Sequence, residues 1–255
     1  MRVLTGDNVG IGGFIVQGIG TKHVLIRAIG PSLSQFGVSN PLADPVLELH
    51  GPGTFVTISN DNWKEDSVQR ALIEATGLQP TNDYECAIEA RLDPGAYTAV
   101  VSGKNNGTGV GLIEVYDLAA SDSSKLGNIS TRAFVSTGND IVIAGFILGG
   151  NNNASGRVII RGIGPSLASA GVANPLANPT LELRDNNGSL ITVNNDWQEN
   201  SAQAIELTNA GLAPAHNLES GIAATLAPGL YTALLSGVNN STGVGLVEVY
   251  DRGAP

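Results

Sequence analysis

VLIRAIGPSL, at residues 24–33, returns as VIIRGIGPSL at residues 158–167, and this repetition decides how the chain is organised. The segments around the motif return at the same offset, among them NPLA at 40–43 and 174–177. A period this long marks a module written twice, and each copy is long enough to bury a core of its own. The sequence therefore predicts two domains of one type, over residues 1–118 and 128–255, joined by a flexible linker at 119–127.

Short apolar runs separated by turn residues fill most of each copy. The spacing of about 8–12 residues between turn signals favours antiparallel strands over a parallel sheet. The sequence Asp185-Asn186-Asn187-Gly188 is a strong hairpin turn. The fold class predicted is all-β: two tandem antiparallel β-sandwiches, jelly-roll-like, each with one short helix.

That helix is predicted where the apolar period changes. Val68, Ala71, Leu72 and Ala75 have the spacing of one helical face, and Asp66 with Gln69 resembles a capping box. The second copy repeats the end signals with Asn200, Gln203 and Gly211, although polar residues replace two of its apolar positions. The helix is therefore predicted less strongly in the second copy.

Composition excludes several classes of function. The net charge is −10 with only 13 Lys and Arg in 255 residues, which argues against nucleic-acid binding. No apolar run is long enough to predict a membrane span. The single cysteine, Cys86, is replaced by Ser220 in the second copy, so neither a disulfide nor a paired-cysteine metal site is predicted.

An enzyme common to both copies finds little support among the residues. The three histidines are not shared, and Ser32 and Ser166 lie in GPSL rather than in the context of a nucleophile elbow. Shared carboxylates include Glu48, Glu85 and Glu114, and a glycoside hydrolase needs only two such groups in apposition. The main interpretation is a strand-face ion pair with Arg27 or a hydrogen-bonded corner, and a carboxylate-dependent hydrolase acting on a polysaccharide stays as the alternative.

Two weak candidate binding sites remain. Oxygen ligands of the kind that Ca²⁺ takes gather at Asp61 and Glu65, and again at Asp196 and Glu199, although turn-capping explains the same residues. No cofactor is required by the sequence, and Ca²⁺ is the one metal hypothesis. The shared aromatic residues would suit a carbohydrate surface if exposed, whereas a tryptophan packed in the core under the helix is the favoured alternative. These are Trp63, Trp197, Tyr97 and Tyr231.

The repeated motifs also resemble a known kind of module. The patterns IRAxGPSL, NPLAxPxLEL and LxPGxYTAxxSGxNNxTGVGLxEVYD are similar to repeat modules of large secreted or surface proteins of environmental bacteria. The second half of each copy resembles bacterial pre-peptidase C-terminal β-sandwiches, through Leu47-Glu48-Leu49 and Pro94-Gly95-Ala96-Tyr97-Thr98 in the first copy. The resemblance implies a non-catalytic accessory module, extracellular or at the cell surface, with an adhesive, binding or structural role. In some relatives such modules bind polysaccharide, protein fibres or Ca²⁺, so a polysaccharide or a matrix protein is the expected partner.

The two copies differ at their start. Asn128–Thr131 should supply a strand to the second domain, whereas the first has only Arg2-Val3-Leu4 in that place. The chain thus looks like a fragment of a longer secreted protein, and the first domain should expose a sheet edge. Exposed edges invite pairing with another chain, which makes head-to-tail self-association a hypothesis and a frayed edge its alternative.

Overall fold

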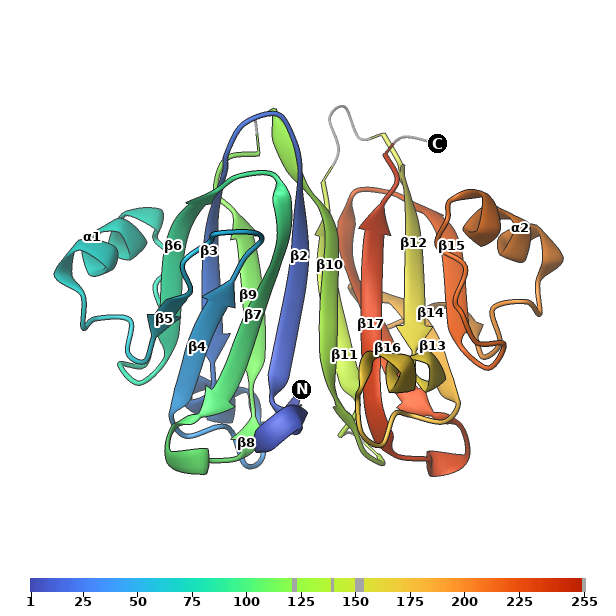
Figure 1. Cartoon of the computed structure of the whole chain (residues 1–255), viewed down its shortest axis with the longest axis horizontal. Coiled ribbons are helices and arrows are strands. Elements are labelled where there is room, and N and C mark those ends of the chain that lie inside the picture. The colour runs from blue at the N-terminus through green and yellow to red at the C-terminus, as the bar shows by residue number, and fades with distance from the viewer. Residues whose placement is uncertain (121–122, 139, 150–153, 254–255) are drawn as a thin grey trace. The chain divides into compact units, whose positions relative to one another are not determined.

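The computed structural model describes residues 1–120, 123–138, 140–149 and 154–253. It divides into two compact units, Met1–Gly127 and Asn128–Pro255. Each unit consists of two antiparallel β-sheets and one α-helix, which confirms the predicted all-β sandwich class (Figure 1).

In the first unit, β3 lies between β6 and β9 in one sheet, and the order β2-β7-β4-β5 forms the other. Short β1 pairs with β8. The strands are β1 (Arg2–Val3), β2 (Gly10–Gly18), β3 (Lys22–Ile29), β4 (Pro45–His50), β5 (Ile58–Asn60), β6 (Cys86–Leu92), β7 (Gly95–Gly103), β8 (Gly109–Val110) and β9 (Leu112–Asp117). The helix is α1 (Ser67–Thr76).

The second unit repeats this plan with orders β15-β12-β17-β10 and β11-β16-β13-β14. The strands are β10 (Ser124–Val135), β11 (Val142–Leu148), β12 (Gly156–Ile163), β13 (Pro179–Asp185), β14 (Leu190–Asn194), β15 (Ser220–Leu226), β16 (Gly229–Gly237) and β17 (Gly243–Asp251), and the helix is α2 (Ser201–Asn209). Asp185–Gly188 forms the predicted turn between β13 and β14, with Gly188 in the left-handed region at φ 78°.

The strand of the repeated motif is buried on both faces, and this explains its continuous apolar run. Leu25 packs under α1 with Trp63, Ile73 and Ala87. Alternation along the strand turns Val24 and Ile26 to the opposite side, and both are fully buried. The helix therefore forms a third layer outside the sheet that contains β3 (Figure 1).

The helix itself presents a different face from the predicted one. Val68 and Leu72 are exposed, whereas Ile73 is completely buried. Gln69, on the same side as Ile73, donates its amide to the carbonyl of Glu89 and accepts from the Glu89 N–H. Its side chain thus fixes the helix to β6 instead of closing a capping box, and Asp66 caps the helix alone through the N–H groups of Val68 and Gln69.

The predicted linker is partly a strand. Ser124 to Gly127 belong to β10, which continues to Val135. Within the first unit, the Nζ of Lys22, which is fully buried, donates to the carbonyl of Ser124 at 3.1 Å, and Ser124 Oγ donates to the carbonyl of Thr21 at 2.9 Å. Residues 121–122 of the predicted linker lie outside the described residues.

A 3-10 helix follows each copy of the central strand, at Pro31–Phe36 and Pro165–Ala170. Gly30 makes this turn possible, because a Cβ at that position would lie 2.2 Å from the carbonyl oxygen of Leu42. Shorter 3-10 turns lie at Gly6–Asn8, Lys104–Asn106 and Val238–Asn240. No helix among the described residues is long and apolar enough to cross a membrane.

Candidate functional site

Glu85 is a completely buried carboxylate, and its partners are donors of the GPSL turn. Its Oε1 accepts from the N–H groups of Gly30 (3.2 Å) and Ser32 (2.9 Å) and from the hydroxyl of Ser32 (2.5 Å). Its Oε2 accepts from the N–H of Asn82. Glu219 makes the same contacts in the second unit. These four donors replace water around the buried carboxylate. Glu85 and Ser32 therefore stabilise the turn and are not accessible to a substrate.

Glu114 belongs to a second, different arrangement on the outer side of the β3 sheet. Arg27 donates through Nε to Glu114 Oε2 at 2.9 Å and through Nη2 to the hydroxyl of Tyr116, which in turn donates to Glu114 Oε1. The guanidinium lies over the Tyr116 ring, 4.9 Å from its centroid. The second unit repeats this group with Arg161, Glu248 and Tyr250.

The ion pair predicted for Arg27 is thus made with Glu114. In the second unit, burial raises the pKa of Tyr250 to about 12, so its hydroxyl stays a proton donor to Glu248 near neutral pH. Glu48 lies elsewhere, half-exposed beside His50. The three shared carboxylates considered for hydrolysis therefore have separate partners, and each is held by them.

The tryptophans are core residues. Trp63 is 4% exposed and Trp197 8%. Trp63 donates its indole N–H to the carbonyl of Asn82 at 3.2 Å, and Trp197 packs with Ile159 and Leu207. The hypothesis of a carbohydrate platform is wrong for both rings, because the helix covers the face that a sugar would need.

Tyr97 and Tyr231 each pack against a neighbouring strand, in the sheet that contains β7 in the first unit and β16 in the second. Tyr97 stacks on Phe14, with ring centroids 5.5 Å apart, and donates its hydroxyl to the carbonyl of Asp93. Tyr231 does the same with Phe146 and Ala227. Burial raises the pKa of Tyr97, which is consistent with a packing role. Tyr97 is buried and offers no ring face to a ligand, whereas Tyr231 is only partly buried, with its ring stacked on Phe146.

The residues predicted to hold Ca²⁺ lie in the loop before each helix. Asp61 forms an ion pair with Lys104 at 2.5 Å, and Glu65 accepts from the amide of Asn62 at 2.6 Å. In the second unit, the amide of Asn194 donates to the carbonyl of Asp196 and, at 3.5 Å, to Glu199. Across the described residues, no three His, Cys, Asp or Glu side chains gather in a way that could hold a metal ion.

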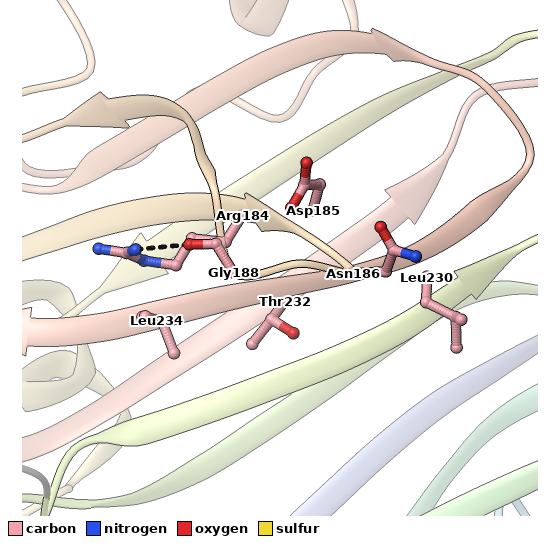
Figure 2. A pocket seen from close by; sticks show the side chains of 7 residues that line it. All are labelled: Arg184, Asp185, Asn186, Gly188, Leu230, Thr232 and Leu234. Carbon is pink, nitrogen blue, oxygen red and sulfur yellow. Dashed lines mark hydrogen bonds between the residues drawn. The ribbon is translucent and has the colours of Figure 1, made fainter.

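A shallow pocket lies on the outer side of β13 and β16 in the second unit (Figure 2). The hairpin turn closes one side, where Arg184 Nη1 donates to the carbonyl of Gly188 at 2.8 Å. Leu230, Thr232 and Leu234 of β16 form the floor. Exposed aliphatic residues continue this surface onto β11, where Ile143 pairs with Leu234 and Ile147 with Leu230. No aromatic ring lines the pocket, so it lacks the stacking surface that a sugar ring would use.

Comparisons with known proteins identify no family. No model of a protein family matches the chain, and no curated protein matches it. Among solved structures, the atomic structure of Sulfolobus Turreted Icosahedral Virus aligns at 10% identity and a TM-score of 0.24, covering 98% of this chain and 88% of that one. The crystal structure of the STIV MCP aligns at 12% identity and a TM-score of 0.23, covering 98% and 93%. PNGF-II aligns at 11% identity and a TM-score of 0.23, covering 100% of this chain and 58% of that one. Similarity at this level carries no conclusion about function.

Sequence reasoning allowed a hydrogen-bonded corner for Glu85 and Glu219 but did not identify their partners. Both were visible as shared acids, but their partners in the GPSL turn are 53 residues away along the chain. A hint was present in the turn itself, since Gly-Pro-Ser offers two backbone N–H groups and a hydroxyl with no acceptor nearby in sequence.

Proposed function

We propose that this chain is a non-catalytic structural module that joins to others by adding a β-strand at the edge of β9. The second unit shows the completed arrangement. There β17 lies between β12 and β10, and β10 pairs with it from Asn128↔Tyr250 to Val135↔Gly243.

The first unit lacks that neighbour. On one side β9 pairs with β3, from Val24↔Asp117 to Ile29↔Leu112. On the other side, Met1 and Gly111 exchange backbone hydrogen bonds of 3.0 and 2.9 Å, and β1 continues the pairing onto β8. Beyond Gly111, β9 is the outermost strand of its sheet among the described residues. This open edge is the observation that carries the proposal.

Burial differs between the two units as the proposal requires. Val247 and Val249 of β17 are 0% and 5% exposed, whereas their counterparts Ile113 and Val115 are only partly buried. A strand added to β9 would remove this apolar surface from water and satisfy the backbone groups of the edge. Strand addition at an exposed edge is a recurring way of joining protein segments.

In the second unit, residues 128–135 of β10 fill the edge that corresponds to the open edge of β9. Asn128 donates its side-chain amide to the carbonyl of Val249 at 3.0 Å, and Phe134 packs against Ile163, Leu167 and Val244. In the first unit, the residues that correspond to these three contacts of Phe134 are Ile29, Leu33 and Val110. An extended segment with the sequence of residues 128–135 therefore matches the acceptor, whether it comes from a preceding module or from another molecule.

A non-catalytic role agrees with the separate, fully engaged environments of the shared carboxylates. A location outside the cell, and an adhesive or binding role there, rest on the sequence resemblance alone. Polysaccharide binding finds no support from the buried tryptophans, so self-association is the interaction favoured here.

The test uses a fluorescent peptide of residues 127–135, titrated with the whole chain and followed by anisotropy. One bound peptide per chain is expected, because the equivalent edge of the second unit is already filled. A matched peptide with Ser130 and Thr131 replaced by proline should not bind, since it lacks the backbone donors of a strand. Equal binding of both peptides, or no binding at all, would refute the proposal.

Sedimentation across a concentration series gives the complementary measurement. Because β10 of each copy is already paired with β17 in its own second unit, self-association requires this strand to be exchanged between molecules. Such association should increase with concentration and be reversed by the peptide. A panel of glycan substrates tests the hydrolase alternative in the same samples.

A further inference from the structure

The second unit contains a group of buried oxygens that have no hydrogen-bond partner. In the described part of the chain, eight buried side-chain polar atoms lack a partner, and six are Oδ1 atoms of Asp or Asn. These six occupy the same three positions in both units: Asp44, Asp61 and Asn62 in the first, and Asn178, Asn195 and Asp196 in the second. Because buried polar atoms are nearly always paired, these exceptions mark the three positions in each unit as candidates for binding an ion or water.

Turn-capping does not explain these exceptions. A capping oxygen accepts a backbone N–H, and these oxygens accept none. The residue before Asp61 and before Asn195 does accept a backbone N–H, but from a distant strand. Asn60 Oδ1 accepts from the N–H of Ala87, and Asn194 Oδ1 accepts from the N–H of Gly221.

Specific contacts hold the three positions of the second unit together. Ser220 Oγ lies 2.8 Å from the carbonyl oxygen of Pro179 and 2.9 Å from that of Asn195, which joins the segment after Asn178 to the loop after β14. The amide of Asn194 lies against both the Asp196 carbonyl and the Glu199 carboxylate. These contacts hold the backbone of Pro179, Asn195 and Asp196 close together, with partly buried side chains at Asn178, Asn195 and Asp196 and an exposed one at Glu199.

The first unit shows what occupies the equivalent place there. Lys104 donates its backbone N–H to the carbonyl of Asp44 and its ammonium to Asp61 Oδ2 at 2.5 Å. Burial, together with the charges of Asp61 and Glu65, raises the pKa of Asp44, and Lys104 opposes this shift. The first unit therefore carries its own cation beside Asp61, held through Oδ2 at the surface, while the Oδ1 atoms of Asp44, Asp61 and Asn62 have no hydrogen-bond partner.

The second unit has Val238 at the position of Lys104. Val238 keeps the backbone contact, donating its N–H to the carbonyl of Asn178 at 2.9 Å, but it brings no charge. The carboxylates of Asp196 and Glu199 and the amide oxygens of Asn178 and Asn195 therefore have no counterpart of the Lys104 ammonium. We propose that the second unit binds one Ca²⁺ ion through Asn178, Asn195, Asp196 and Glu199.

The chemistry of the donors selects this ion. All four residues offer oxygen, as carboxylate or amide carbonyl, which is the set that Ca²⁺ accepts in irregular geometry with water completing the shell. Zn²⁺ and copper favour nitrogen or sulfur ligands, which these residues do not offer. With only two carboxylates, an affinity in the range of extracellular calcium modules is expected, about 10⁻⁴–10⁻³ M.

The test is calorimetric titration of the chelator-treated whole chain with CaCl2. One equivalent should bind to the original chain, and Asp196→Ala should weaken binding by at least about tenfold. Asn195→Ala is the second variant, with circular dichroism confirming that each variant is folded. The melting temperature of the original chain should also rise with Ca²⁺ and not with Mg²⁺ at the same concentration.

Asn62→Ala in the first unit is the matched control, because it removes the counterpart of Asp196. It should leave Ca²⁺ binding unchanged. The proposal is wrong if the original chain binds no Ca²⁺, if Asp196→Ala and Asn195→Ala both bind it as the original does, or if Asn62→Ala abolishes the bound equivalent. Because the peptide and calcium experiments measure different sites, either proposal can fail without the other.

Discussion

At the scale of single residues, the two copies show which side chains the fold depends on. Cys86 donates through Sγ to the carbonyls of Pro45 and Asp61, each at 3.0 Å, and Ser220 makes the same two contacts in the second unit. Burial raises the pKa of the Cys86 thiol, so it stays protonated as a donor and is not a nucleophile. Residues that looked like candidates for chemistry, Cys86 and Glu85 among them, are therefore parts of the hydrogen-bonded frame.

Glu85→Gln tests the role of the buried carboxylate. The amide removes the negative charge and turns one acceptor into a donor, which leaves N–H groups of the GPSL turn without a full partner. We expect a loss of about 2–3 kcal/mol in the free energy of unfolding, measured by urea denaturation. Glu48→Gln, at a half-exposed carboxylate, is the control and should change stability by less than about 0.5 kcal/mol. Equal effects of the two changes would contradict a stabilising role for the buried Glu85 carboxylate.

At the scale of elements, the helices show how a local pattern can mislead. The spacing of Val68, Ala71, Leu72 and Ala75 suggested an inward face, yet the helix turns Ile73 to the sheet instead. The Gln69 side chain explains this orientation, because its amide completes backbone hydrogen bonds at Glu89 on the edge of β6. Gln203 does the same in α2, where it bonds Gly221 and Ala223.

Ile73→Ala and Val68→Ala separate the two possible helix faces. Ile73 is completely buried against Leu25, Trp63 and Ala87, so its truncation should leave a cavity and cost about 2–5 kcal/mol. Val68 is 68% exposed, and its replacement should change stability by less than about 0.5 kcal/mol. Thermal and urea unfolding measure both. A larger effect at Val68 would support the face that the periodicity suggested.

At the scale of the whole molecule, the chain consists of two compact units with the same strand plan. They differ where function is proposed. The first has an open edge at β9 and the Lys104 ammonium beside Asp61, and the second has a filled edge at β17 and Val238 at the position of Lys104. The two units therefore share one strand arrangement and differ at this strand edge and at the position of Lys104.

Because each unit has its own core, damage to one core should stay within its unit. Leu207 is completely buried beneath α2 with Ile159 and Trp197. Leu207→Ala should increase hydrogen exchange throughout residues 128–255 and leave residues 1–127 unchanged, measured by mass spectrometry of peptides. Ile205→Ala, at a residue that is 61% exposed, serves as the control and should alter neither unit. Increased exchange in both units would show that they unfold together.

The sequence by itself determined the duplication, the all-β sandwich class, the hairpin at 185–188 and the strand that begins the second unit. These features follow from repeats, turn residues and apolar runs, whose signals lie within a few residues of one another. The tertiary structure alone decided the inward face of α1, the partners of Glu85, the burial of both tryptophans and the unpaired oxygens around Asn178. Each of these depends on which distant segments meet: Ser32 and Glu85 are 53 residues apart, and Ser220 is 41 from Pro179. Sequence spacing describes neighbours along the chain, whereas burial and hydrogen-bond partners are fixed only when the sheets and the helix pack together.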